Sequence, residues 1–299
     1  MRTPAWILAA AVFLQGCGPQ STTSKTAPKT EPAAAVTYGD NPAAGKTFEH
    51  DGVRLYYEIY GQGEPLLVVH GNGGSIADMR RQIAYFRDRY RVIAMDSRDQ
   101  GKSADSPDKI TYEKMAGDLA ALLDHLETGP VNVLGWSDGG IEALLLAIRN
   151  PGKVKKIVSM AANLDPQGLQ PETSEVIRGW VKDMQADPNQ TPQRKREEKV
   201  TAMQLDEPHI PLKALESITA PVLILASDHD LIRDQHTLDI YHHIPNSQLA
   251  IFANATHAIP FDDPARFNAT VERFLAEPFV KKDRVQDALK SFEALRTGK

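Results

Sequence analysis

The sequence predicts an α/β protein built on a doubly wound, mostly parallel sheet. Short apolar runs recur at residues 66–69, 92–95, 131–134, 154–160 and 222–226, and segments with helical spacing, such as 112–126, lie between them. Strands that are apolar throughout are typical of sheets buried on both faces, and helical connections make consecutive strands parallel. A ligand site is therefore expected in the loops at the carboxyl ends of the strands.

The predicted domain runs from residue 46 to residue 299. Residues 53–60 mix apolar and charged side chains as a strand does, before a Gly-Gln-Gly turn, and residues 281–295 have the spacing of an amphipathic helix. The alternation of strands and helices stops between about 163 and 215, where helix-like pieces at 172–184 and 194–204 predict a small helical lid. Residues 193–199 carry both charge signs, which indicates a solvated helix face.

The first residues predict export and lipid attachment. Residues 1–16 combine a positive start with an apolar run at 5–14, which is too short to span a bilayer and is typical of a signal peptide. Leu14-Gln15-Gly16-Cys17 resembles the lipobox of bacterial lipoproteins, whose cysteine is acylated; an ordinary signal peptide is the alternative. Residues 17–45 are too polar to form a core and predict a tether. We therefore expect a domain held at a membrane of the bacterial cell envelope by a lipid on Cys17.

Composition argues against several other functions. The 299 residues carry a formal net charge of −5, which gives no reason to expect nucleic acid as a partner. A single cysteine excludes an intrachain disulfide and argues against a cysteine-based metal site. The cluster of His229, His236, His242 and His243 suggests a metal, but adjacent helix positions point about 100° apart, so solvent-facing histidines are the better interpretation. No metal and no cofactor are expected.

A nucleophile elbow lies in the middle of the chain. Gly135-Trp136-Ser137-Asp138-Gly139-Gly140 follows the strand 131–134 and precedes the helical run 141–149. This is the G-x-S-x-G pattern at a sharp strand-to-helix turn, which exposes the serine and needs glycines because other side chains would clash. The helix directs its first amide groups and its positive dipole end toward an oxyanion. The sequence therefore predicts Ser137 as the nucleophile.

A second glycine loop, His70-Gly71-Asn72-Gly73-Gly74, directly follows the strand 66–69. A loop in this place supplies half of an oxyanion hole, and the backbone N–H groups of Asn72 and Asp138 are the predicted donors. A phosphate-binding loop is the alternative, but its lysine and the full G-x-G-x-x-G pattern are absent. We interpret His70 as a structural, hydrogen-bonding histidine.

A serine nucleophile needs a base and an acid that orients the base, in the chain order Ser, Asp or Glu, His. His257 follows the strand-like residues 248–252, and Asp230 follows the strand 222–226. Asp228 competes with Asp230 for the role of the acid, and its alternative role is to cap the loop.

Together these motifs resemble the α/β-hydrolase superfamily from about residue 46 to 278. Residues 96–103 are similar to its D-x-R-G-x-G-x-S loop, with Asp99 in place of a glycine. Residues 221–230 are similar to its P-V-L-x-x-x-G-x-x-D segment, with Ser227 in place of another glycine, and this match selects Asp230 over Asp228. The elbow is similar to that of valacyclovirase-like amino-acid ester hydrolases, although it occurs more widely in the superfamily.

The resemblance implies a serine hydrolase with the α/β-hydrolase fold, in which His257 takes the proton of Ser137 and Asp230 holds the imidazole. A small carboxylic ester is the predicted substrate. Amide, thioester, lactone or C–C bond hydrolysis, and a ligand-binding or receptor protein that kept the fold, stay open. Trp136 and Asp138 are further candidates for substrate contact. For Asp138 the alternatives are pairing with the ammonium group of an α-amino ester and capping the following helix.

Overall fold

The computed structural model describes residues 36–283 and 285–297. The predicted signal peptide, the lipid on Cys17 and most of the predicted tether lie outside the described residues. Within those residues, none of the helices has the length and the apolarity needed to span a membrane.

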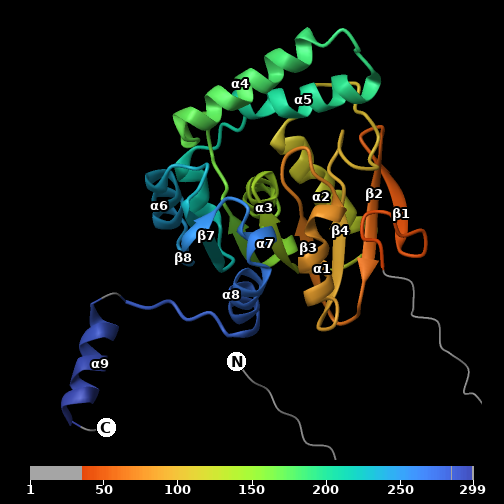
Figure 1. Cartoon of the computed structure of the whole chain (residues 1–299). Coiled ribbons are helices and arrows are strands. Elements are labelled where there is room, and N and C mark those ends of the chain that lie inside the picture. Colours follow the sequence, from red (N-terminus) through yellow and green to blue (C-terminus); the bar gives the residue numbers. More distant parts are fainter. Residues whose placement is uncertain (1–35, 284, 298–299) are drawn as a thin grey trace, which may run out of the picture. The chain divides into compact units, whose positions relative to one another are not determined.

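One eight-stranded sheet organises the described part of the chain, in the order β1-β2-β4-β3-β5-β6-β7-β8 (Figure 1). Strand β2 pairs antiparallel with both β1 and β4, and all other neighbours are parallel. The predicted doubly wound, mostly parallel sheet is confirmed, and β1 is an addition to it. The strands are β1 Gly45–His50, β2 Val53–Tyr60, β3 Glu64–Val69, β4 Tyr90–Met95, β5 Val131–Trp136, β6 Val154–Met160, β7 Val222–His229 and β8 Ser247–Thr256.

Helices cover both faces of the sheet because successive strand residues point to opposite faces. Leu67 of β3 contributes to the apolar core that includes side chains of α2, α3 and α6, whereas Leu66 contributes to the core that includes α1 and α8. The helices are α1 Arg80–Phe86, α2 Tyr112–His125, α3 Asp138–Arg149, α4 Pro171–Ala186, α5 Pro192–Asp206, α6 Asp234–His243, α7 Ile259–Asp262, α8 Pro264–Ala276 and α9 Gln286–Thr297.

The folded part begins earlier than the sequence predicts. Tyr38 packs edge-on against Tyr60 of β2, with ring centroids 4.9 Å apart. The buried carboxylate of Glu58 accepts hydrogen bonds from the backbone N–H groups of Gly39 at 2.7 Å and Asn41 at 3.0 Å. A buried carboxylate must be hydrogen-bonded, and these two amides help to satisfy it. Residues near 40 are therefore held on β2 and are not part of a free tether.

Helices α4 and α5 lie side by side in the segment between β6 and β7 (Figure 1). Each begins with a proline at its first position, which suits a helix start because that position needs no N–H donor. Ile177 and Val181 of α4 and Val200 and Met203 of α5 are the buried apolar residues that hold the pair on the domain. The pair lies on the same side of the molecule as the loops at the carboxyl ends of the strands.

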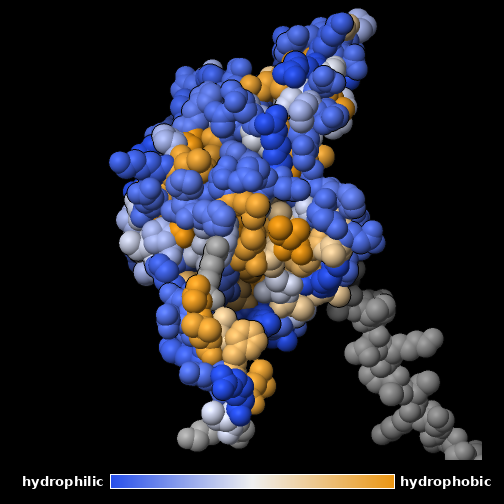
Figure 2. Space-filling model, turned by 90° about the vertical axis from the view of Figure 1, so that its left-hand side faces the viewer, coloured by the Kyte–Doolittle hydropathy of each residue, from blue (hydrophilic) through white to orange (hydrophobic). Residues whose placement is uncertain are grey.

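The β8 end of the sheet is partly apolar at its surface. Strand β8 is an edge strand, and its Ile251 is 48% exposed. Figure 2 looks onto this side and shows hydrophobic residues gathered in places among a mostly hydrophilic surface.

Candidate active site

The elbow turns sharply at Ser137, which connects β5 to α3. Its backbone has φ 57° and ψ −119°, a conformation that costs about 1 to 3 kcal/mol for a non-glycine residue and persists only where the surroundings hold it. The flanking glycines make the turn possible, because a Cβ on Gly135 would lie 2.0 Å from the carbonyl oxygen of Gly139. The turn leaves the serine side chain at the carboxyl end of the sheet.

Three side chains from separate loops meet at this turn. His257 Nε2 lies 3.0 Å from Ser137 Oγ, and His257 Nδ1 lies 2.7 Å from Asp230 Oδ1. The other oxygen of Asp230 accepts the backbone N–H of Ser227 at 3.1 Å, which orients the carboxylate. The structure thus brings together the residues predicted as nucleophile, base and acid, in an arrangement that can move a proton from serine to imidazole.

Asp228 lies outside this line of contacts. Its two carboxylate oxygens accept the backbone N–H groups of Asn254 at 2.7 Å and Ala255 at 2.9 Å. These hydrogen bonds, from Ala255 and then Asn254, lower the pKa of the Asp228 carboxyl. The side chain therefore holds the end of β8 just before His257, a structural role like the capping role that was its alternative.

The glycine loop 70–74 lies directly against the elbow. A Cβ on Gly71 would come within 3.1 Å of the Ser137 Cβ and 2.9 Å of the Trp136 ring, so any larger residue there would push against both side chains. His70 is buried and structural: its Nε2 accepts the N–H of Ser97 at 3.0 Å, which leaves Nδ1 to donate to the Gly71 carbonyl at 2.7 Å. The N–H of Asp138 is at the first position of α3, where amides lack an acceptor within the helix.

A cavity of about 500 Å³ opens above Ser137 and His257. Its walls are mainly apolar and come from the elbow, the lid helix α4 and the loop after β7. The lining residues are Asn72, Trp136, Ser137, Asp138, Asn163, Leu169, Glu172, Thr173, Val176, Ile177, Trp180, Gln204, Leu231, Ile232 and His257. None of these lining residues is a lysine or an arginine, so the described walls offer no fixed positive charge to a ligand.

Residues 64–204 match the family model described as the alpha/beta hydrolase fold. The described residues thus have the α/β-hydrolase fold. Mouse serine hydrolase BPHL is 29% identical to this chain over 272 residues, which cover 83% of the chain and 91% of the mouse protein. 3-Oxoadipate enol-lactonase 2 of Acinetobacter baylyi is 32% identical over 108 residues, which cover 36% of the chain and 40% of that enzyme.

Solved structures give the same fold. An α/β-hydrolase enzyme from a Medee basin deep-sea metagenome library matches with a TM-score of 0.71 at 21% identity. The match covers 80% of this chain and 100% of the metagenome enzyme. A thermophilic esterase from Thermogutta terrifontis matches with a TM-score of 0.65 at 25% identity. The match covers 78% of this chain and 97% of the esterase.

The Asp138 carboxylate is enclosed. The residue is 3% exposed, and its Oδ2 accepts the side-chain amide of Asn72 at 2.9 Å. Burial raises the pKa of the carboxyl, while hydrogen bonds from Asn72 and Tyr112 act in the opposite direction. Ser137 is the cap residue of α3 and Asp138 is its first helical residue, so the carboxylate lies in the first turn, where the helix dipole favours a negative charge. The carboxylate accepts hydrogen bonds from these two side chains and also lines the cavity, so its contact with a substrate ammonium group stays a prediction.

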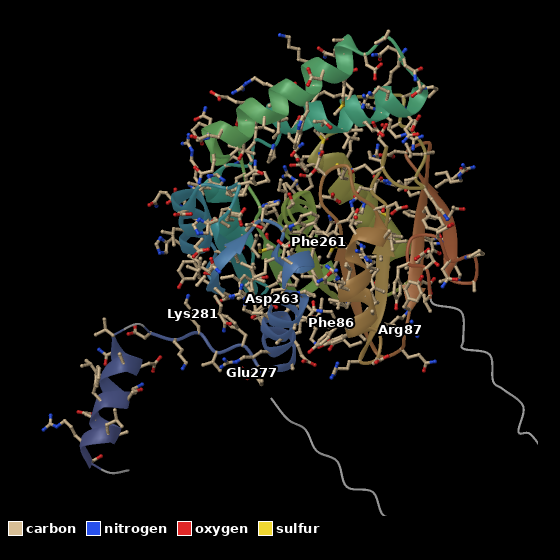
Figure 3. All side chains as sticks on the ribbon, in the orientation of Figure 1. Phe86, Arg87, Phe261, Asp263, Glu277 and Lys281 are labelled. Carbon is tan, nitrogen blue, oxygen red and sulfur yellow. The ribbon has the colours of Figure 1, made fainter. Side chains whose placement is uncertain are left out.

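Trp136 lines the cavity and also holds the histidine loop. Its indole N–H donates to the backbone carbonyl of His257 at 3.0 Å. On its other side it packs edge-on against Phe261 of α7, with ring centroids 4.7 Å apart; Figure 3 labels Phe261. The sequence pattern did not point to Phe261, which is an ordinary apolar residue near the end of a short helix.

Two predictions about charged and polar side chains need correction. The solvated face expected at 193–199 is only partly solvated, because Lys199 reaches Asp99 at 2.8 Å. His236 does not face solvent: its Nε2 accepts the backbone N–H of Leu164 at 2.9 Å, and burial lowers the pKa of its imidazole. Within the part of the chain that the structure describes, no group of three or more His, Cys, Asp or Glu side chains is placed to hold a metal ion.

Asp99, which stands where the superfamily loop has a glycine, keeps the glycine-like backbone. Its φ is 62°, in the left-handed region that aspartate tolerates better than most residues. The carboxylate accepts the N–H of Ser106 at 3.1 Å and its hydroxyl at 2.6 Å, which stabilises the loop in this conformation.

Proposed function

We propose that this α/β hydrolase cleaves a small, uncharged carboxylic ester through an acyl-enzyme formed on Ser137. The observation that carries the proposal is the position of His257, whose two ring nitrogens lie 3.0 Å from Ser137 Oγ and 2.7 Å from Asp230 Oδ1 at the floor of the cavity. A nucleophile, a base and an acid within hydrogen-bond reach form the arrangement that activates serine toward a carbonyl carbon.

In the proposed reaction, His257 Nε2 takes the hydroxyl proton as Ser137 Oγ bonds to the ester carbonyl carbon. The carbonyl oxygen becomes an oxyanion that accepts hydrogen bonds from the backbone N–H groups of Asn72 and Asp138, and losing one such donor costs about 3 to 4 kcal/mol in the barrier. The imidazolium, held by Asp230, gives its proton to the leaving alcohol. Water then attacks the acyl-enzyme with the same base, which releases the carboxylic acid and restores the serine.

The walls of the cavity support an uncharged, largely apolar substrate. Val176 and Trp180 of α4 and Leu231 after β7 line it and are 49%, 55% and 45% exposed, so they are open to a bound acyl or alcohol group. Glu172 adds a negative charge at the cavity, which disfavours substrates that carry a carboxylate. The name of the Acinetobacter relative keeps lactone hydrolysis as the first alternative.

Labelling by a fluorophosphonate probe tests the proposal. We expect the wild type to react stoichiometrically and Ser137→Ala to show no label, with Tm unchanged within a few degrees because an elbow serine adds little to packing. Ester turnover by clean Ser137→Ala protein, or a wild type that neither labels nor turns over esters, would contradict it, and the second result favours the ligand-binding alternative. A matched panel of ester, amide, thioester and lactone substrates then identifies the bond cleaved.

We also propose that the protein is exported and anchored to a bacterial membrane by acylation of Cys17. The proposal depends on the lipobox-like Leu14-Gln15-Gly16-Cys17, which holds the one cysteine of the chain. Since each buried CH₂ contributes about 0.8 kcal/mol, two or more acyl chains would make the attachment stable.

A further inference from the structure

The side chain of Asn72 connects three parts of the molecule. Its amide nitrogen donates to Asp138 Oδ2 at 2.9 Å and to the backbone carbonyl of Val200 at 3.0 Å. Asp138 begins α3, and Val200 lies in the middle of the lid helix α5. Both amide hydrogens of one side chain are therefore directed at two elements that are far apart in the sequence.

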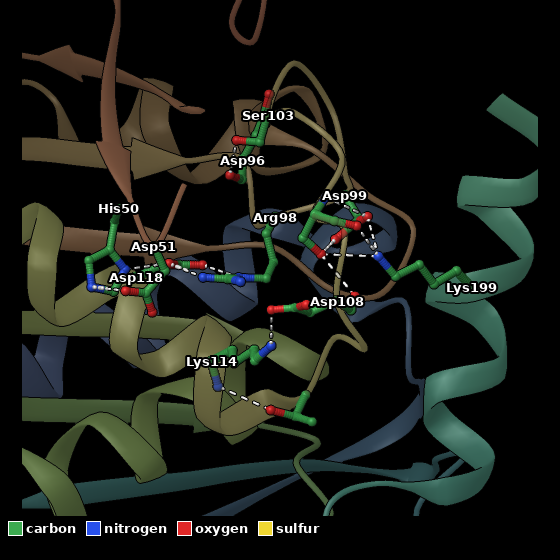
Figure 4. A network of polar contacts seen from close by, with 12 residues as sticks. His50, Asp51, Asp96, Arg98, Asp99, Ser103, Asp108, Lys114, Asp118 and Lys199 are labelled. Atoms are coloured by element: carbon green, nitrogen blue, oxygen red, sulfur yellow. Dashed lines mark hydrogen bonds and ion pairs between the residues drawn. The ribbon is translucent and has the colours of Figure 1, made fainter. Parts of the chain in front are cut away.

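Helix α5 is itself fastened to the loop that follows β4. Lys199, next to Val200, lies 2.8 Å from Asp99 Oδ1 and donates to the Ser106 carbonyl at 2.7 Å, as Figure 4 shows for Asp99 and Lys199. Arg196, one turn earlier, forms an ion pair with Asp105. The Asp99 carboxylate is buried, so its pairing with Lys199 is screened less than a surface ion pair would be. These contacts set the position of the Val200 carbonyl.

The other partner of Asn72, Asp138, is held in place by a contact with α2. Asp138 is buried at the start of α3, where Tyr112 of α2 is also a hydrogen-bond donor to its carboxylate. A donor left without its acceptor in such a place costs about 1 to 3 kcal/mol. The Asn72 amide therefore has a strong preference for the one orientation that satisfies both Asp138 and Val200.

We propose that Asn72 is a positioning residue whose side chain fixes the direction of its own backbone N–H, so that the seating of α5 controls the oxyanion hole. The inference rests on the proposed function, because it assigns that N–H to the oxyanion. The backbone N–H is present whatever the side chain is, so any change in catalysis on truncation comes from orientation. Helix α5 then acts on the rate of the reaction as well as on access to the cavity.

The first test is Asn72→Ala, which keeps the backbone amide and removes both side-chain contacts. We expect kcat for an ester to fall about 10- to 100-fold, as a small misplacement of a catalytic group does, with KM changed less than about twofold. The Ki of a trifluoromethyl ketone, which forms a tetrahedral adduct with an oxyanion, should rise in parallel with the fall in kcat/KM. Asn246→Ala, which removes a side-chain amide bonded to the Thr219 carbonyl, is the matched control.

The second test acts through α5 alone, and it also serves if Asn72→Ala does not fold. Lys199→Met should lower kcat several-fold, whereas Lys195→Met, at an exposed position of the same helix, should not. In the Asn72→Ala background the Lys199→Met effect on kcat should disappear, because the link to the oxyanion loop is already broken.

Additive effects of the two substitutions on kcat, or an unchanged kcat and trifluoromethyl ketone Ki in Asn72→Ala, would overturn the inference while leaving the proposed ester hydrolysis intact. A wild type that neither turns over esters nor binds the ketone would contradict both the inference about Asn72 and the proposed ester hydrolysis.

Discussion

Replacing Asp230 by Asn tests which carboxylate orients His257. Asp230 Oδ1 lies 2.7 Å from His257 Nδ1, and Oδ2 accepts the Ser227 N–H at 3.1 Å. An asparagine has one oxygen and one NH₂ group for these two positions. If the oxygen faces Ser227, the NH₂ group faces Nδ1 and forces the imidazole to carry its proton on Nε2, where it cannot accept the proton of Ser137. If the oxygen faces Nδ1, the NH₂ group meets the buried Ser227 N–H.

The first arrangement keeps the backbone hydrogen bond and gives the inactive tautomer. We therefore expect Asp230→Asn to lower kcat by about 10⁴-fold, the loss typical of such a substitution in a Ser-His-Asp site. This is about 5.4 kcal/mol in the activation barrier. The fold should remain, because the substitution adds no volume at this position.

Asp228→Asn is the matched control, since it makes the same chemical change two residues earlier. It removes one of two acceptors for the N–H groups of Asn254 and Ala255, so the end of β8 loses one hydrogen bond and the contacts of His257 stay. We expect kcat within about threefold of the wild type. The assay is kcat and KM for a p-nitrophenyl ester, with Tm measured on each variant. A larger loss of kcat in Asp228→Asn than in Asp230→Asn would refute the assignment of the acid.

Three further predictions concern the buried acid, the glycine loop and the N-terminus. Burial raises the pKa of Glu142 in α3 well above its usual range, so the free energy of unfolding should fall as pH rises from the ordinary carboxyl range through the folded-state pKa. Glu142→Gln should therefore reduce the fall in Tm between about pH 5 and pH 9. Equal slopes of Tm against pH in the wild type and the variant would contradict this prediction. Gly71→Ala would place a Cβ 3.1 Å from the Cβ of Ser137 and should slow fluorophosphonate labelling at least about tenfold. An unchanged labelling rate would show that the glycine loop moves to accept the methyl group. Cys17→Ser should abolish labelling by an alkyne fatty acid in cells, and equal labelling would exclude attachment at this residue.

The sheet and the elbow could be predicted because local sequence decides them. Apolar runs such as residues 131–134 suit strands buried on both faces wherever they occur, and a turn at Ser137 with a positive φ needs the close-packed Gly135 and Gly139 beside it. The chain order of Ser137, Asp230 and His257 then limits which loops can meet at the carboxyl end of the sheet. Their catalytic roles stay a prediction until the variants are measured.

Contacts between distant segments could not be predicted in the same way. The sequence pattern of α5 shows charges of both signs, which is equally consistent with a solvated face and with the ion pair that Lys199 makes with Asp99. Tyr38 lies in a segment that is polar on average, so composition placed it in a tether, whereas one aromatic contact and a buried glutamate hold its neighbourhood on β2.

The fold class, the nucleophile elbow and the candidate catalytic residues could thus be predicted from local sequence, because backbone conformation at turns and the burial of apolar runs depend on neighbouring residues. The contacts of the Asn72 and Asp138 side chains, in contrast, depend on the packing of distant segments. Their partners Val200 and Tyr112 come from helices that are separate in the sequence, and whether a polar group pairs with another or faces the cavity depends on how those helices pack.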